Sequence, residues 1–312
     1  MKLRSYLLAF VASLPLGVII AILSAGEAGA ADTRRYASNK TVYADGRVRE
    51  LAAISVTAVQ GDKYYINARM QNEDATARML AELRLRCTSS SVDLYTTENM
   101  SSGQDLLVLR GRYIFRAPAN DTYACRLQVR SQIPGGHNDP NAKFLVRGSG
   151  TFIAVSVRQP PWVKHRYQDT AKLIRTNRAK DVAAMSFAAP SDITDFSATA
   201  DVEMTNCYND GRLCDTSPRN SKSAVVGSRL MVMQRAVGGG FCRTTRWPSS
   251  GLDRTTITRD EHHEKNYHRV SGVRVSSDPS CTRDFRIKVY TKVLSGNDVM
   301  IEAKPYSNVF VR

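Results

Sequence analysis

The residues of this chain best suited to chemistry are the histidines of one short segment. His262, His263 and His268 lie there, and Glu264 follows the second of them. Imidazole and carboxylate groups are common zinc ligands. The zinc-protease pattern His-Glu-x-x-His is nevertheless absent, because His268 comes one residue too late after His263-Glu264.

The spacing also opposes a metal site built from this segment alone. On a helix, the interval from His263 to His268 places the two rings about 140° apart. On a strand, His262 and His268 share a face but lie about 20 Å apart at roughly 3.3 Å per residue. We therefore interpret the segment as a solvated loop or strand edge. His262, Glu264 and His268 become candidate metal ligands only if another strand contributes.

No other pattern points to catalysis. The sequence contains no Gly-x-Ser-x-Gly nucleophile elbow, and nothing places a serine or an aspartate beside a histidine. We predict no catalytic residue, no bound metal and no cofactor. The sequence favours a binding protein over an enzyme.

Residues 1–30 have the features of a targeting segment. Lys2 and Arg4 give it a basic start, residues 6–25 are uncharged and mostly apolar, and Ala28-Gly29-Ala30 fits a cleavage site. We expect a signal peptide, with the mature chain beginning near Ala31. The alternative is an uncleaved membrane anchor through residues 5–25, because an apolar run of roughly 20 residues can also span a bilayer. Either way the remaining chain is exported, and is secreted or held at the extracytoplasmic cell surface.

Export makes the six cysteines candidates for disulfides rather than for metal ligands. The expected pairs are Cys87 with Cys125, Cys242 with Cys281, and Cys207 with Cys214. The first two pairs repeat nearly the same interval, 38 and 39 residues, which predicts one equivalent bridge in each of two similar units. The third pair encloses Asp210-Gly211, a hairpin-turn signal.

Most of the chain alternates apolar and polar residues with the period of β-strands. The alternation is clearest at residues 81–87 and 123–130, and it returns at 285–290 after a break at Pro160-Pro161. We predict an all-β fold with two tandem antiparallel β-sandwich domains. Their expected ranges are residues 31–158 and 191–312, joined by a basic linker at residues 159–190.

A short run in the first unit resembles a known fold family. Asp121-Thr122-Tyr123-Ala124-Cys125 is similar to the Asp-x-Tyr-x-Cys run of immunoglobulin-fold domains. The resemblance implies a tyrosine corner at Tyr123 and an inter-sheet disulfide between Cys125 and Cys87. It covers five residues, so it implies an Ig-like sandwich and no function.

The candidate binding residues are basic. The formal net charge is +15 at pH 7, and a surplus of this kind attracts anionic surfaces. On the predicted strands at 81–87 and 123–130, arginines alternate with the cysteine-bearing face, so they form one cationic patch if the two strands are neighbours. The candidates are Arg84, Arg86, Arg126 and Arg130 on these strands, and Arg243, Arg246 and Trp247 in a turn-rich segment.

These observations predict an exported, non-enzymatic binding or surface-association protein. Its expected target is an anionic surface, a glycan or a protein partner. Export favours an anionic cell-surface polymer or another envelope protein over nucleic acid. One alternative is a structural or assembly component of the envelope that is held by its N-terminal anchor. The other is a secreted metal-dependent hydrolase centred on the histidine segment.

Overall fold

The computed structural model describes residues 30–36, 38–88, 92–207, 214 and 223–312. The predicted signal or anchor segment, up to residue 29, and the predicted turn at Asp210-Gly211 lie outside the described residues. The described residues form the strands β1 to β21 and one 3-10 turn, η1 (Gly148–Gly150), which confirms the all-β prediction. Among them, no helix has the length and apolar character needed to cross a membrane.

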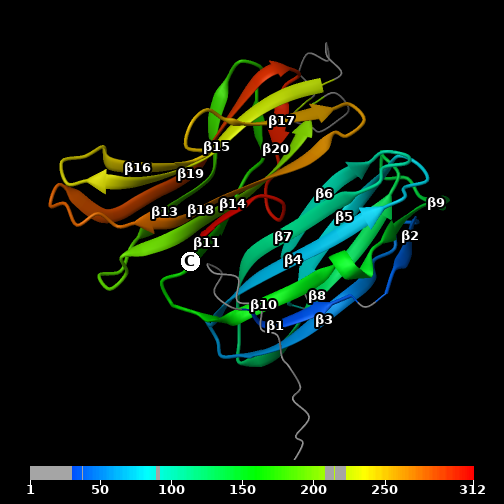
Figure 1. Cartoon of the computed structure of the whole chain (residues 1–312), viewed down its shortest axis with the longest axis horizontal. Helices are drawn as coiled ribbons and strands as arrows, with labels where there is room; N and C mark the ends of the chain where they lie inside the picture. Colours follow the sequence, from blue (N-terminus) through cyan, green and yellow to red (C-terminus); the bar gives the residue numbers. More distant parts are fainter. Residues whose placement is uncertain (1–29, 37, 89–91, 208–213, 215–222) are drawn as a thin grey trace, which may run out of the picture.

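The N-terminal sandwich consists of two antiparallel sheets (Figure 1). One has the strand order β1-β10-β4-β9-β2, with β7 also paired to β4, and the other has the order β3-β8-β5-β6. The strands are β1 (Ala30–Arg35), β2 (Lys40–Ala44), β3 (Arg49–Ala58), β4 (Lys63–Glu73), β5 (Met79–Arg86), β6 (Leu94–Met100), β7 (Leu107–Arg116), β8 (Asp121–Gln132), β9 (Asp139–Val146) and β10 (Phe152–Gln159).

The C-terminal sandwich also has two antiparallel sheets. One has the order β11-β21-β14-β20-β12, with β18 paired to β14, and the other has the order β13-β19-β15-β16, with β17 paired to β15. The strands are β11 (Lys164–Tyr167), β12 (Lys172–Ile174), β13 (Ala179–Ala188), β14 (Asp195–Asn206), β15 (Ser223–Ala236), β16 (Phe241–Trp247), β17 (Asp253–Thr258), β18 (His263–Arg274), β19 (Cys281–Gly296), β20 (Val299–Ile301) and β21 (Asn308–Val311).

The two sandwiches share one strand order. Strands β1 to β6 occupy the places of β11 to β16, and β7 to β10 occupy the places of β18 to β21, while β17 is an addition. The sheet β3-β8-β5-β6 therefore corresponds to β13-β19-β15-β16, and the sheet around β4 corresponds to the sheet around β14.

The basic linker predicted at residues 159–190 is not a linker in the structure. Strands β11, β12 and β13 fall within this range, and they pair with β21, β20 and β19 of the C-terminal sandwich. The alternation of apolar and polar residues does not reveal these strands, because β11 and β12 are short and β13 contains a register shift between Val182 and Met185. Ala183 lies at this shift with a positive φ of 44°. The connection between the sandwiches is therefore short and runs from Pro160 to Val163.

The six cysteines form three disulfides, in the predicted pairs. The two long bridges are not equivalent, because Cys87–Cys125 joins the end of β5 to β8, whereas Cys242–Cys281 joins β16 and β19, the counterparts of β6 and β8. The expectation of an inter-sheet bridge is wrong, because Cys87 directly follows β5 and Cys125 lies on its neighbour β8. The tyrosine corner is present as local geometry: the Tyr123 hydroxyl donates to the Ala119 carbonyl at 2.7 Å and accepts from its N–H at 3.0 Å.

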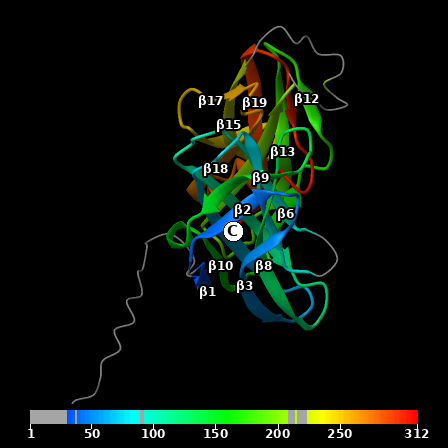
Figure 2. The same cartoon turned by 90° about the vertical axis from the view of Figure 1, so that its right-hand side faces the viewer.

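Each sandwich has its own apolar core, and a smaller cluster lies between them. The small cluster consists of Tyr65 on β4, Ile114 on β7, Phe310 on β21, and Val163 in the connection between the sandwiches. Trp162, also in the connection, packs against it. Tyr65 and Ile114 lie on the outer face of one sheet, since their neighbours along the strands fill the N-terminal core. The sheet around β4 therefore packs its outer face against the equivalent sheet around β14. The C-terminus lies at this junction (Figures 1 and 2).

Polar and charged contacts surround the apolar cluster. Arg112 on β7 forms an ion pair with Asp201 on β14, which is fully buried. The Lys265 ammonium on β18 lies 3.7 Å from the Glu203 carboxylate, and both side chains are at most 1% exposed. The Tyr267 hydroxyl donates to the Arg110 carbonyl at 3.0 Å. The contacts of Arg112 with Asp201 and of Arg110 with Tyr267 join the two sandwiches, whereas Lys265 and Glu203 pair within the C-terminal one.

Candidate functional site

The predicted arginine rows come together on one sheet. Strands β5 and β8 are neighbours, and their register places Arg86 opposite Arg126, Arg84 opposite Gln128, and Glu82 opposite Arg130. The buried residues that alternate with them face the N-terminal core. We call the outward set Arg84, Arg86, Arg126, Gln128 and Arg130 the arginine face.

Acidic neighbours hold three of the four guanidinium groups of this face. Glu82 lies 2.9 Å from Arg130 and 3.6 Å from Arg84. Burial raises the pKa of Glu82, while the charge of Arg130 opposes that rise. Arg126 forms an ion pair with Glu50 on β3. The face therefore carries four positive and two negative charges, fewer net charges than the arginines alone suggest.

Arg86 and Arg126 are the members best placed to meet a ligand. The Arg86 Nε donates to the Thr88 carbonyl at 2.7 Å, and burial raises the pKa of the nearby Asp93, a rise that the charge of Arg86 acts to lower. Arg126 is 45% exposed. Both line a cavity of about 630 Å³ beside the Cys87–Cys125 bridge. A guanidinium group offers two parallel N–H donors, which match the oxygens of a carboxylate, sulfate or phosphate.

The second predicted group lies in the other sandwich and does not join the arginine face. Arg243, Arg246 and Trp247 are on β16, where Trp247 is opposite Leu230 of β15. The Trp247 side chain is 40% exposed, and its ring lies 5.5 Å from the His268 ring. This segment is therefore a strand with partly exposed aromatic and basic side chains rather than a free loop.

The C-terminal sandwich has a basic outer face of its own on the equivalent sheet. Arg286 and Lys288 of β19 alternate with the buried Phe285 and Ile287. Asp181 of β13 accepts a hydrogen bond from the Lys288 ammonium at 2.7 Å and lies 3.6 Å from Arg286. Sequence analysis missed this face because the strand that supplies Asp181 falls in the predicted linker.

The histidine segment is not a solvated loop, which corrects part of our interpretation: β18 is an edge strand of its sheet, but most of its side chains are covered. Strand β18 pairs with β14 and is covered by β6 of the other sandwich. The His263 Nδ1 lies 3.0 Å from the Thr205 hydroxyl, and the His268 Nε2 lies 3.1 Å from the Ser228 hydroxyl. Burial lowers the pKa of His263 to about 3 and that of His268 to about 4. Both rings are therefore neutral at physiological pH.

The candidate metal ligands are not gathered into one site. His268 is fully buried and directed at Ser228, in the interior of the C-terminal sandwich. Burial and the charge of Glu261 raise the pKa of Glu264 to about 7. The part of the chain that the structure describes contains no group of three or more histidine, cysteine or acidic side chains suited to a metal ion. The segment instead makes contacts with the first sandwich.

Comparisons with known proteins identify no family. No family model matches the chain, and no curated protein matches it. The chain is similar to the tandem domain CBM22-1-CBM22-2 of Xyn10C from Paenibacillus barcinonensis, with 10% identity, 88% of this chain and 86% of that chain covered, and a TM-score of 0.25. It is also similar to the PBSX exported protein XepA, with 9% identity, 90% and 87% covered, and a TM-score of 0.23. Likenesses this weak carry no argument about function.

Proposed function

We propose that this protein is an exported, non-enzymatic binding protein that associates with polymers carrying anionic groups through the arginine face. The observation that carries the proposal is the pairing of β5 with β8, which turns two separate arginine rows into one surface. The three disulfides support a place outside the cytoplasm, secreted or at the cell surface, since such bonds persist in oxidising compartments.

The acidic residues restrict the movement of the arginine side chains on this face. Glu82 and Glu50 hold Arg130, Arg84 and Arg126 in place, so less side-chain entropy is lost when a ligand is bound. Each exposed ion pair contributes only about 0.2–1 kcal/mol. A single small anion would therefore bind this face weakly, whereas a polymer that presents many anionic groups gains from repeated contacts.

The test compares Arg86→Ser/Arg126→Ser with Arg175→Ser/Arg178→Ser as a matched control. Both double variants remove two positive charges, and Arg175 and Arg178 are exposed residues of the other sandwich. Arg84 and Arg130 are left intact because they pair with the buried Glu82. Binding to immobilised polygalacturonate, a polycarboxylate, is measured alongside neutral dextran at about 50 mM and about 500 mM salt, which screens exposed charges to different extents.

We expect the unmodified protein to bind polygalacturonate at low salt and to be released at high salt. The loss of Arg86 and Arg126 should weaken binding about two- to thirtyfold, from two exposed pairs of about 0.2–1 kcal/mol each. The control pair should change binding much less. Equal losses in both double variants, or equal binding to dextran, would show that the arginine face is not the site.

A further inference from the structure

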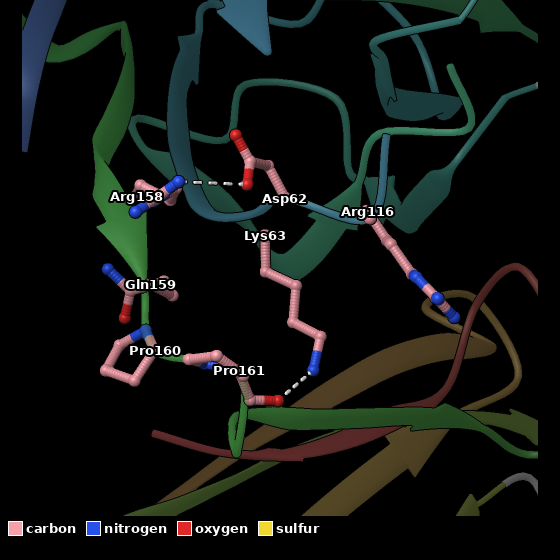
Figure 3. A pocket seen from close by; sticks show the side chains of 8 residues that line it. Asp62, Lys63, Arg116, Arg158, Gln159, Pro160 and Pro161 are labelled. Atoms are coloured by element: carbon pink, nitrogen blue, oxygen red, sulfur yellow. Dashed lines mark hydrogen bonds and ion pairs between the residues drawn. The ribbon is translucent and has the colours of Figure 1, made fainter. Parts of the chain in front are cut away.

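A second cluster of cations lies where the sandwiches meet. Figure 3 shows a cavity of about 540 Å³ at the ends of β4, β7 and β10, closed on one side by the connection between the sandwiches. Its charged lining consists of Lys63, Arg116 and Arg158 with one acidic residue, Asp62. Arg158 lies 3.4 Å from Asp62. Lys63 and Arg116 therefore have no acidic partner within the lining.

The cluster continues into an adjoining cavity, also of about 540 Å³. This second cavity shares Lys63 and Arg116 and adds Lys164 and His165 from β11 of the C-terminal sandwich. Together the two cavities present four cationic side chains and a single carboxylate. The sequence separates these residues by up to a hundred positions, so only the folded arrangement shows them as one group.

The connection between the sandwiches holds Lys63 in position. Its ammonium donates to the Pro161 carbonyl at 2.5 Å (Figure 3) and to the Val163 carbonyl at 2.6 Å. Burial lowers the pKa of Lys63, and the neighbouring charges of Arg116 and Lys164 lower it further. Positive charges thus crowd one another at a site where the protein supplies little negative charge. Such crowding is relieved when an anion binds between the cations.

His165 adds a polar atom with no partner. Its Nε2 is shielded from solvent and makes no hydrogen bond within the described structure. Buried polar atoms are normally hydrogen-bonded, so an unpaired one needs a reason. Burial lowers the pKa of His165 to about 3, so the ring is neutral and can donate from one nitrogen without adding charge.

We propose that the two adjoining cavities, together called the junction cavity, bind a small ligand through an oxyanion group, a carboxylate or a phosphate. Lys63 and Arg116 line both cavities, Arg158 lines the first, and Lys164 lines the second. The volume of each cavity lies within the roughly 300–1,000 Å³ of known small-molecule sites, and it leaves space for a sugar-sized body beside the anionic group. Because Lys164 belongs to the C-terminal sandwich and the other three cations to the N-terminal one, the ligand bridges the two.

The test is calorimetric titration of the full chain with galacturonate, inorganic phosphate and neutral galactose. Arg116→Ser and Lys164→Ser are compared with Arg175→Ser and Lys180→Ser, which remove the same charge types from exposed positions elsewhere. We expect binding of at least one of the two anions and none of galactose. A charge-assisted hydrogen bond contributes enough that losing Arg116 or Lys164 should weaken binding about tenfold or more.

The outcomes separate this site from the arginine face. Galacturonate binding alone identifies a carboxylate ligand, and phosphate binding alone identifies a phosphate ligand; either supports the site. Binding of neither anion, or binding that survives both Arg116→Ser and Lys164→Ser, overturns it. Arg86→Ser/Arg126→Ser should leave the titration unchanged, so failure of the polymer experiment does not decide this one. Thermal melts of each variant confirm that the fold is retained.

Discussion

Replacing Lys265 with Met tests whether its buried ammonium group joins the two sandwiches. The Lys265 ammonium donates to the Tyr95 carbonyl at 2.7 Å and to the Thr96 hydroxyl at 2.9 Å, and it faces the Glu203 carboxylate. Tyr95 and Thr96 belong to one sandwich, while Lys265 and Glu203 belong to the other. The substitution therefore removes contacts across the junction without altering either apolar core.

The expected loss follows from the burial of Glu203. Removing one partner of a buried ion pair costs about 3–5 kcal/mol, because the other charge is left unpaired. Burial raises the pKa of Glu203 to about 8, and Lys265 is the first group that opposes this rise. Without Lys265 the carboxyl stays protonated to a still higher pH. The variant avoids most of that cost by keeping Glu203 protonated. The extra loss at about pH 9 is therefore about 1.4 kcal/mol, the cost of protonating a carboxyl one unit above its pKa of about 8. At about pH 6 Glu203 is protonated in both proteins, so this part of the loss disappears.

The assay is urea unfolding followed by tryptophan fluorescence. Trp162 packs at the junction, so its emission reports on the contact between the sandwiches. Lys265→Met/Glu203→Gln is the matched control, since it removes both charges and should regain part of the loss at high pH. Equal losses at both pH values would refute the reasoning.

Two further predictions concern single residues. Gly296 has a φ of +85°, and a Cβ there would lie 2.0 Å from a backbone carbonyl oxygen. Gly296→Ala should therefore lower the melting temperature far more than Gly103→Ala, whose Cβ would meet nothing within 4 Å at a similar φ of +72°. The second prediction uses Glu264, whose pKa is raised from 4.5 to about 7. The folded state then binds more protons than the unfolded state, so stability should fall between about pH 4.5 and 7, by up to about 3 kcal/mol. Glu264→Gln should flatten that decline in urea titrations, and an unchanged slope would contradict the assignment.

The alternation of residues was sufficient to predict many of the strands, and the repeated cysteine interval was sufficient to predict the two long cysteine pairs. The alternation at residues 123–130 and 285–290 is a property of single strands, and β8 and β19 cover both segments. The arginine rows were predicted to gather only if their strands were neighbours, and the register of β5 with β8 met that condition. Each of these features depends on the spacing of residues along a single strand.

Contacts between strands far apart in the sequence could not be predicted in the same way. Asp201, Glu203 and Lys265 sit at polar positions of alternating strands, a pattern typical of a solvated face. They are buried because a second sandwich covers that face. For the same reason, no pattern along the chain indicates that Lys63 and Lys164 line the same cavity.

The shared strand order has a consequence for how one molecule meets a polymer. The sheets around β4 and β14 bury parts of their outer faces at the junction, and β6 also contacts β18 there. Strands β8 and β19, which are counterparts, carry basic residues on their outer faces. Arg126 lies on β8 and Lys288 on its counterpart β19. The short connection and the junction contacts, among them the Arg112–Asp201 ion pair, join these two surfaces without a long flexible linker. A polymer that engaged both would therefore lose less entropy than one bound by loosely tethered domains.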